Sequence, residues 1–352
     1  MGDSFGLENV LWFANNKEDA HEEPTIKRSR SHDYVSKEVI NVRENVGLVE
    51  VANFSKHEFK GPDARKFLDH IMAGRLPKPG RISLSPMLSY RGKLCGDLTV
   101  ACLDENEFMV FGSGAAQEMH RRWFESHLDK FNLSYSNRSD EYHGLSIAGP
   151  NSRKVLEKIV RDDVSNEKFK FRDSRRMFVG GVPAIINRIS FTGELGYEIY
   201  VAPHYQLKLY EELMEAGKEF NIKPFGGRAL MSMRLEKNWG AWTLDYRPDF
   251  TAKETGLDAF INWDKEFIGK ESAQKENSSN KLVPLIVETN EIDVTNNEAV
   301  LNGDQSIGYV TSGGFAHFVN KSVAFTFVDQ KNIKSENKIQ VCLLYTSPSP
   351  RD

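Results

Sequence analysis

The residues best suited to chemistry are a carboxylate and an aromatic ring that follow a glycine-containing turn, in Phe191-Thr192-Gly193-Glu194-Leu195-Gly196-Tyr197-Glu198-Ile199-Tyr200. The two glycines after an apolar run predict a tight turn, because glycine adopts positive φ without steric cost. The alternation that follows places Tyr197, Ile199 and Val201 on one face of a strand and Glu198 with Tyr200 on the other. Such a carboxylate suits a flat heterocycle with paired N–H donors. The alternative is an exposed hairpin with a solvated glutamate.

A second carboxylate lies on a predicted strand over residues 94–103. One face of that strand carries Asp97 among small neighbours, Cys95, Thr99 and Ala101. Small neighbours leave room for a ligand, and a buried carboxylate needs a partner. A strand with one solvent-facing side accounts for the same pattern and is the alternative.

Two arginines, Arg228 and Arg234, lie on a predicted helix over residues 226–239. An inward-facing guanidinium binds a carboxylate through two parallel hydrogen bonds. A surface Arg234 paired with Glu236 is the alternative. The stretch 308–314 is glycine-rich but lacks the lysine and following helix of a phosphate-binding loop, so it predicts a strand and a turn. Histidine and cysteine spacings indicate neither a metal site nor a Ser/His/Asp or Cys/His arrangement.

The elements that position these residues include an internal repeat. Gly61-Pro62-Asp63-Ala64-Arg65-Lys66-Phe67-Leu68 recurs as Gly149-Pro150-Asn151-Ser152-Arg153-Lys154-Val155-Leu156, each after a short strand-like run. Asp63 and Asn151 are suited to cap the helices that follow. The repeat predicts two related strand–turn–helix subdomains in one layered α+β body.

The remaining elements alternate in type. Residues 94–103 and 107–112 predict a hairpin, and residues 117–130, 205–220 and 226–239 predict helices. The polar segment 275–281 predicts a linker. Alternating runs at 281–288, 307–311 and 322–328 then predict a small β-barrel or sandwich.

Composition indicates an ordinary globular protein with roughly two or three domains. The 352 residues are 39% hydrophobic and 27% charged, with a net charge of −4 that gives no reason to expect nucleic acid. The basic run Lys27-Arg28-Ser29-Arg30 is interpreted as a solvated loop. The three cysteines indicate neither a disulfide framework nor a zinc site. Apolar runs fall short of the ~18 residues that span a bilayer, and the start lacks the pattern of a signal peptide.

Together these segments resemble the aminomethyltransferase family, typified by the T-protein of the glycine cleavage system. The resemblance covers about residues 35–343 and rests on the stretches 92–100, 148–150, 192–198, 233–236 and 310–313. Phe267-Ile268-Gly269-Lys270 and the opening stretch 5–13 are similar to the C-terminal half of dimethylglycine and sarcosine dehydrogenases. In that subgroup the opening is the tail of an FAD-bearing module, whose dinucleotide fingerprint G-x-G-x-x-G does not occur in this chain.

The resemblance implies a three-subdomain cloverleaf that binds tetrahydrofolate at its centre, with two related α+β subdomains and a C-terminal small β-barrel. Asp97 matches the family's catalytic aspartate, Glu198 its pterin-binding glutamate and Arg234 a binding arginine. Phe191 and Tyr197 are further expected folate contacts. The family has Tyr where this chain has Phe191, so the ring is kept and the hydroxyl is lost.

The implied function is capture of a methylene iminium, released on oxidation of an N-methyl amine, to give 5,10-methylenetetrahydrofolate. The alternatives are a stand-alone aminomethyltransferase acting on a lipoyl-bound group, a non-catalytic folate-binding member of the fold, and a demethylase variant. An FAD-dependent oxidoreductase module is the expected partner, in the same chain or another, and cytosol or mitochondrial matrix the expected location.

We expect residues 1–34 to be the tail of a preceding module or a linker, 35–273 the folate-binding domain and 274–343 the C-terminal barrel domain. Residues 344–352 resemble a translated sequencing adapter and are interpreted as a non-native tail, so the natural chain is expected to continue beyond residue 343.

Overall fold

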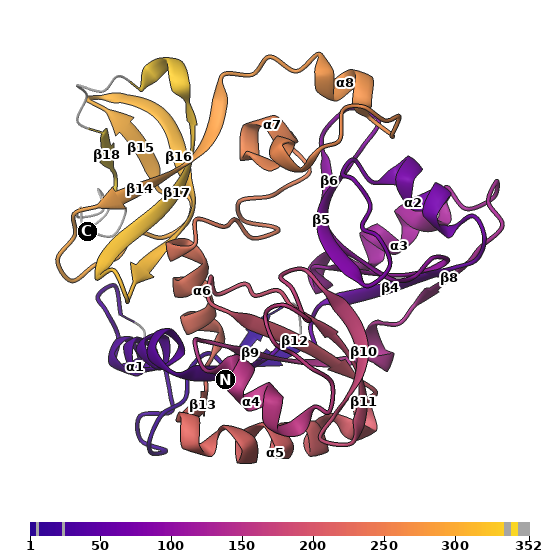
Figure 1. Cartoon of the computed structure of the whole chain (residues 1–352). Helices are drawn as coiled ribbons and strands as arrows, with labels where there is room; N and C mark the ends of the chain where they lie inside the picture. Colours follow the sequence, from indigo (N-terminus) through magenta and orange to yellow (C-terminus); the bar gives the residue numbers. More distant parts are fainter. Residues whose placement is uncertain (5–6, 23–24, 334–338, 344–352) are drawn as a thin grey trace.

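The computed structural model describes residues 1–4, 7–22, 25–333 and 339–343. Within these ranges three larger sheets surround the middle of the molecule, as Figure 1 shows: the C-terminal sheet at the upper left, a sheet containing β5 and β6 at the upper right, and a sheet containing β9, β11 and β12 below. The expected non-native tail lies outside the described residues. The α+β class with three bodies of structure is confirmed.

The first large sheet has five strands in the order β5-β6-β7-β4-β8. Its strands are β4 (Ser55–Lys60), β5 (Arg81–Leu88), β6 (Leu94–Asp104), β7 (Glu107–Gly112) and β8 (Ser134–Asn137). Helices α2 (Ala64–Ile71) and α3 (Gln117–Glu125) accompany it. The predicted hairpin is confirmed as β6 and β7, which pair antiparallel. Helix α3 is shorter than the predicted span 117–130, because the chain turns at Ser126.

The second large sheet has six strands in the order β10-β11-β12-β9-β3-β13, with α4 and α5 beneath it in Figure 1. Its strands are β3 (Val46–Glu50), β9 (His143–Ala148), β10 (Ser174–Val179), β11 (Val182–Asn187), β12 (Gly196–Val201) and β13 (Ile222–Pro224). Apolar residues of this sheet form one core with α4 (Ser152–Ile159) and α5 (Gln206–Gly217). Helices α1 (Ser31–Glu44) and α6 (Gly227–Glu236) share a separate core.

The internal repeat is confirmed as two strand–turn–helix units, β4–α2 and β9–α4. Gly61 and Gly149 make the two turns at φ +138° and +132°. The capping prediction is wrong, since neither Asp63 nor Asn151 makes a side-chain cap hydrogen bond. The Asp63 carboxylate instead accepts from the backbone N–H of Asn132 at 2.8 Å, so it joins α2 to the end of the loop before β8.

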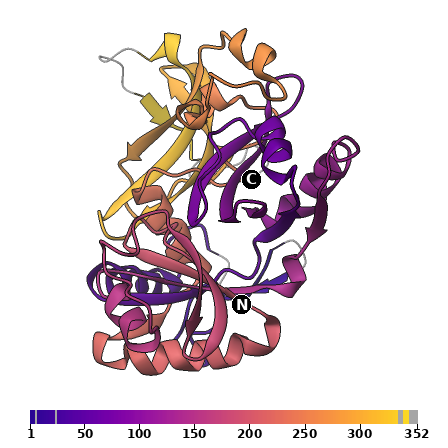
Figure 2. The ribbon, with the colours of Figure 1, turned by 45° about the vertical axis from the view of Figure 1, so that its right-hand side comes forward.

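The C-terminal sheet is a single curled sheet of five strands, β14-β17-β16-β15-β18, seen behind α7 and α8 in Figure 2. Its strands are β14 (Asn280–Val287), β15 (Ala299–Asn302), β16 (Gln305–Ala316), β17 (Lys321–Asp329) and β18 (Ile339–Val341). The turn predicted within 308–314 is wrong, because β16 continues through Gly313 and Gly314. A Cβ on Gly313 would lie 2.5 Å from the Val294 carbonyl oxygen, so glycine is needed for close approach there.

The remaining elements are short. They are β1 (Gly2–Ser4) and β2 (Leu7–Asn9), which pair with each other, and the helices α7 (Ala252–Thr255) and α8 (Lys270–Gln274). Six 3₁₀ turns occur in the described chain, at Gly114–Ala116, Ser139–Glu141, Pro203–Tyr205, Lys218–Phe220, Leu257–Phe260 and Gln330–Asn332.

The N-terminal segment joins the C-terminal sheet through charged contacts. Arg28 makes two hydrogen bonds to Asp293, of 3.0 and 2.9 Å, and its guanidinium lies 4.1 Å from the centre of the Phe315 ring. The interpretation of residues 27–30 as a solvated loop is therefore wrong for Arg28. In the described part of the chain, every helix is too short or too polar to span a bilayer.

Candidate active site

Glu198 lies on the central strand β12, between β11 and β9, with 6% of its surface exposed. Its carboxylate accepts a hydrogen bond of 2.9 Å from the Tyr200 hydroxyl. Desolvation raises the pKa of Glu198 to about 7, although the Tyr200 hydrogen bond acts in the opposite direction. The predicted sharing of one strand face by Glu198 and Tyr200 is confirmed, and the exposed-hairpin alternative is excluded. Of the two glycines before it, only Gly193 adopts positive φ, at +87°.

Asp97 lies on β6, opposite Pro86 of β5. Desolvation raises the pKa of its carboxyl group to about 7, and the charge of Asp97 contributes to a raised pKa of Tyr246. No other side chain among the described residues hydrogen-bonds this carboxylate. A desolvated carboxylate without a fixed partner is suited to exchange a proton near neutral pH.

The faces that carry Asp97 and Glu198 meet at an aromatic contact. Thr99 shares its strand face with Asp97 and pairs across the sheet with Phe111 of β7. The Phe111 ring lies 4.6 Å from the ring of Tyr200, which donates to Glu198. The two carboxylates therefore belong to surfaces of two different sheets that approach one another between the subdomains.

A second chain of contacts connects the same two carboxylates. Lys237, directly after α6, lies 5.3 Å from the centre of the Trp239 ring, and its charge lowers the pKa of Glu198. Trp239 in turn makes an edge contact with the ring of Tyr246, at 6.2 Å between centroids. Tyr246 is the residue whose pKa responds to Asp97. The segment 237–246 thus contributes residues to the surroundings of both carboxylates.

Arg234 is fully buried and pairs with Asp245 at 2.6 Å. Asp245 also accepts from the hydroxyls of Thr311, at 2.5 Å, and Ser312, at 2.7 Å, on β16. The guanidinium therefore joins α6 to the C-terminal sheet. The alternative partner of Arg234, Glu236, instead binds Arg43 at 2.5 Å.

The two remaining predicted site residues are Tyr197, on β12, and Phe191, in the turn before it. Tyr197 is fully buried in the core on the face opposite Glu198, stacked on Phe169 at 5.8 Å. Phe191 is partly buried in the turn before β12. The structure therefore brings together Glu198 and Tyr200 on a surface that contacts the Asp97 face through Phe111, and it places Tyr197 on the far side of the sheet.

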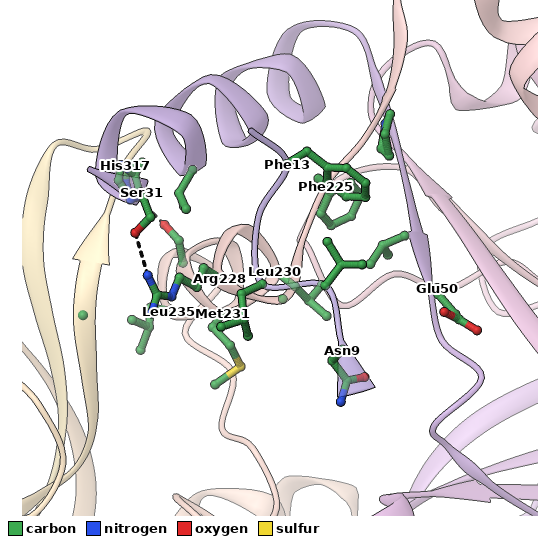
Figure 3. Close-up of a pocket in the computed structure, with 18 of the residues that line it drawn as sticks. Asn9, Phe13, Ser31, Glu50, Phe225, Arg228, Leu230, Met231, Leu235 and His317 are labelled. Carbon is green, nitrogen blue, oxygen red and sulfur yellow. Dashed lines mark hydrogen bonds between the residues drawn. The ribbon is translucent and has the colours of Figure 1, made fainter. Parts of the chain in front are cut away.

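Figure 3 shows a pocket of about 970 Å³. Its walls come from residues 9–13, β3, α6 and the segments 293–295 and 313–317, and Figure 3 shows Leu230, Met231 and Leu235 of α6 lining it. Val51 lines the pocket and approaches the Tyr200 ring across Gly144. None of the five predicted site residues lines this pocket. We place the chemistry at the carboxylates, because the size of a pocket does not supply reactive groups.

Polar groups gather at one end of this pocket. Arg228 donates to the Ser31 hydroxyl at 2.6 Å, as the dashed line in Figure 3 shows, and its guanidinium lies 4.9 Å from the centre of the Trp12 ring. Of the two candidate arginines, Arg228 therefore faces the pocket and Arg234 does not.

Sequence patterns missed Lys56, Lys237 and Tyr246. Lys56 is buried on β4, donates to the Ala52 carbonyl at 2.6 Å and lies 5.9 Å from the centre of the Tyr200 ring. Burial lowers the pKa of Lys56 to about 8. Alternation along β4 identifies which residues share a face, but only the pairing of Lys56 with Phe111 brings it to the Tyr200 surface.

The chain belongs to the glycine cleavage T-protein family. The model of the GCVT N-terminal domain matches residues 1–265, and the model of the glycine cleavage T-protein C-terminal barrel domain matches residues 280–346. The likeness expected from the sequence motifs is thereby confirmed.

Curated relatives include both classes of enzyme that the motifs resemble. The chain is 34% identical over 352 residues to mitochondrial dimethylglycine dehydrogenase of Mus musculus, which covers 98% of this chain and 40% of the relative. It is 30% identical over 309 residues to an aminomethyltransferase of Caldanaerobacter subterraneus subsp. tengcongensis, which covers 86% of this chain and 82% of the relative. The chain therefore spans well under half the length of the dimethylglycine dehydrogenase, and it is a member of an enzyme family.

The fold has a counterpart among solved structures. The glycine cleavage system aminomethyltransferase T from Bartonella henselae superposes with a TM-score of 0.80 over 95% of this chain and 90% of that one, at 22% sequence identity. At this identity the likeness shows the fold alone.

Proposed function

We propose that this chain is a one-carbon transfer domain that binds tetrahydrofolate, its substrate, between the sheets that carry Asp97 and Glu198. The observation that carries the proposal is the pair of desolvated carboxylates on approaching surfaces, joined through Phe111 and Tyr200. The free acceptor oxygen of Glu198 fits the donors of this ligand. Glu198 uses one oxygen for Tyr200 and keeps the other free for the ring N–H and 2-amino donors of a pterin.

In this proposal each residue has a distinct role. Glu198 fixes the orientation of the pterin, while Tyr200 and the surrounding sheet hold the carboxylate in place and exclude water. Asp97, without a fixed hydrogen-bond partner in the described chain, accepts a proton from the folate amine and offsets the positive charge that develops there. Bound tetrahydrofolate supplies the two nucleophilic nitrogens that accept the methylene unit of the iminium, giving 5,10-methylenetetrahydrofolate. The carbon–nitrogen bond of the iminium breaks, and the demethylated amine leaves with the two protons that the folate nitrogens lose.

The source of the methylene unit in this proposal is a flavin-dependent amine oxidation. The support is the match to dimethylglycine dehydrogenase. That enzyme is much longer than the part of it that matches this chain. We propose that an FAD-bearing module, in the same natural chain or in another, provides the iminium. Arg234 acts in this proposal by positioning α6, because Asp245 occupies its guanidinium. We propose a mitochondrial matrix setting, which the mitochondrial dimethylglycine dehydrogenase of Mus musculus supports, with the cytosol as the alternative.

The test is anaerobic calorimetry with tetrahydrofolate, combined with an assay of methylene capture from an enzymatically generated iminium. Asp97→Asn is expected to keep folate affinity and lower the capture rate about 100-fold or more, the usual size of a general acid–base contribution. Glu198→Gln is expected to weaken folate binding at least about tenfold. Unchanged capture by Asp97→Asn, with folding verified by circular dichroism, removes Asp97 from the reaction.

A stand-alone aminomethyltransferase is the second candidate. The observation that favours it is coverage, since the aminomethyltransferase match spans 82% of that relative. Turnover of an aminomethyl-lipoyl carrier protein without any flavoprotein would support this candidate. Turnover only with a flavoprotein and an N-methyl amine would support the first.

A further inference from the structure

Lys237 lies at the end of α6 and is held beside the turn that leads into β12. Its ammonium donates to the Ser190 carbonyl at 2.8 Å and lies 5.3 Å from the centre of the Trp239 ring. Gly193 lies beside this stem, since a Cβ there would be at contact distance, 3.4 Å, from the Lys237 Cβ. The stem of Lys237 therefore runs along the turn, and its charged end has a defined position.

That position is on the Glu198 side of the sheet. Ser190 lies against Gly196, where an added Cβ would come 2.7 Å from the Ser190 Cβ. Gly196 and Glu198 share one face of β12, being two residues apart. The carbonyl that holds Lys237 therefore belongs to the same surface as the Glu198 carboxylate.

The two charges interact without touching. Desolvation lowers the pKa of Lys237 and the charge of Glu198 acts in the opposite direction, while the charge of Lys237 acts to lower the pKa of Glu198. Yet the described residues contain no hydrogen bond or ion pair between them, since Tyr200 holds the carboxylate and Ser190 holds the ammonium. The surface thus presents an acceptor and a separate donor to the same space.

We propose that Lys237 and Glu198 together recognise the pyrimidine edge of the pterin, and that Lys237 selects the 4-oxo form of that ring. This inference rests on the proposed function. The edge of a 4-oxo pterin carries a carbonyl acceptor next to the N3–H and 2-amino donors. A carboxylate accepts from the two donors, whereas an ammonium, which has donors only, suits the carbonyl.

A neutral 2,4-diamino ring presents the opposite pattern at the 4-position and at N3, which carries no hydrogen. Its 4-amino group places a donor where the 4-oxo ring has an acceptor, so it meets the Lys237 ammonium donor to donor. A site built to hydrogen-bond a particular group discriminates strongly against an analogue that cannot complete the bond. Glu198 contributes to this discrimination as well, because the diamino ring keeps the 2-amino donor but lacks the N3–H. The share of Lys237 is the part of the affinity ratio that is lost when its ammonium is removed.

The alternative is that Lys237 only fastens α6 to the turn through Ser190. Lys237 retains solvent exposure, and exposed lysines commonly make such contacts with little energetic consequence. The two roles differ in one measurable respect. A fastening lysine affects both ligands alike, whereas a selecting lysine changes the ratio of their affinities.

The experiment is anaerobic calorimetry of the full chain with tetrahydrofolate and with its reduced 2,4-diamino analogue, tetrahydroaminopterin. The wild type is expected to bind tetrahydrofolate at least about tenfold more tightly than the analogue, the scale of one charge-assisted hydrogen bond. Lys237→Met is expected to lower that ratio several-fold by weakening tetrahydrofolate binding, and Glu198→Gln is expected to weaken the binding of both ligands. Lys218→Met, an exposed lysine on another helix end, is the matched control.

The outcomes separate the inference from the proposed function. If the folded wild type binds neither ligand, the proposed function fails and the inference fails with it. If the wild type binds tetrahydrofolate but Lys237→Met keeps the same ratio between the two ligands, the inference alone is overturned. A several-fold fall of the ratio in Lys237→Met, with the ratio intact in Lys218→Met, supports it.

Discussion

Asp97 and Glu198 share an environment that holds both carboxyl groups near their protonation midpoint at neutral pH. Desolvation is the first cause in each case, and it raises both pKa values to about 7. Desolvation of this kind destabilises the free protein, because each charged form loses hydration. The Tyr200 hydroxyl replaces that hydration only in part at Glu198, and no other side chain of the described residues replaces it at Asp97. Sites that hold carboxylates in this way are characteristic of function, since a structural role is better served by a paired or apolar residue.

The stability of the chain should therefore depend on pH through Glu198. Its folded pKa of about 7 lies above the unfolded value of 4.5, so the folded state binds the proton more tightly. The free energy of unfolding then falls as pH rises from about 4.5 to 7 and levels off above that. Glu198→Gln removes this dependence while keeping an acceptor for Tyr200. Relative to wild type, the variant should gain about 1–3 kcal/mol between pH 5 and pH 8.

Urea unfolding at the two pH values measures this difference, and contributions from other buried carboxylates cancel between the two proteins. Glu211→Gln on the exposed side of α5 serves as the control and should show no gain. An equal gain in both variants, or none in either, contradicts the assignment of a destabilising charge to Glu198.

At the scale of single residues, strand alternation predicted which face Glu198 occupies. It could not predict that Tyr197 is a core residue. Alternation does not tell which face of a strand contacts a ligand and which packs against helices α4 and α5. The caps predicted at Asp63 and Asn151 are absent, and residue type alone could not predict this. Both residue types favour caps, but Asp63 found a backbone donor from a distant loop.

At the scale of elements, α6 is anchored to β16 by one buried ionic network. Arg234, Asp245, Thr311 and Ser312 are all buried, and Asp245 accepts from the other three. Removing one member of a buried ion pair leaves the other charge without compensation, at a cost of about 3–5 kcal/mol. Asp245→Ala should therefore lower the free energy of unfolding by about that amount.

The double variant Asp245→Ala/Arg234→Met should be less destabilised than the two single changes predict together, because it removes both charges. Urea unfolding followed by tryptophan fluorescence measures all three variants. Arg234→Lys tests the competing role: if Arg234 contacts folate, this change weakens binding with little effect on unfolding. Strict additivity of the single changes would falsify the buried-pair interpretation.

Element types and order were largely predictable, whereas their long-range partners were not. The periodicities of β6, β7, α5 and α6 predicted those elements within a few residues. The continuation of β16 through Gly313 was not predictable, since it depends on close approach of the Val294 carbonyl. The partner of Arg234 likewise lies on a loop 11 residues away, beyond the helix neighbours that spacing suggests.

At the scale of the whole molecule, Arg43 of α1 joins parts that sequence analysis treats separately. Its guanidinium binds Glu194 in the turn before β12 at 2.7 Å and Glu236 at the end of α6 at 2.5 Å. Glu236 also accepts from the backbone N–H of Phe318, between β16 and β17, at 2.8 Å. One arginine therefore connects α1, the second large sheet, α6 and the C-terminal sheet around the Glu198 surface.

Arg43→Met should consequently affect stability and ligand binding together. It leaves Glu236 buried without its cation, which costs about 3 kcal/mol or more. It also releases both the turn that precedes Glu198 and the helix end that carries Lys237, so folate affinity should fall about tenfold if both side chains contact the ligand. Arg121→Met is the matched control, because Arg121 also binds two glutamates, Glu118 and Glu125, but on the exposed side of α3.

Arg121→Met should lower the free energy of unfolding by less than about 1 kcal/mol and leave folate affinity unchanged, as expected for exposed ion pairs. Urea unfolding and calorimetry on both variants provide the comparison. A stability loss in Arg43→Met with unchanged affinity shows that the connection supports the fold without organising the site. Loss of both stability and folate affinity indicates that Arg43 aligns the Glu198 carboxylate with the Lys237 ammonium.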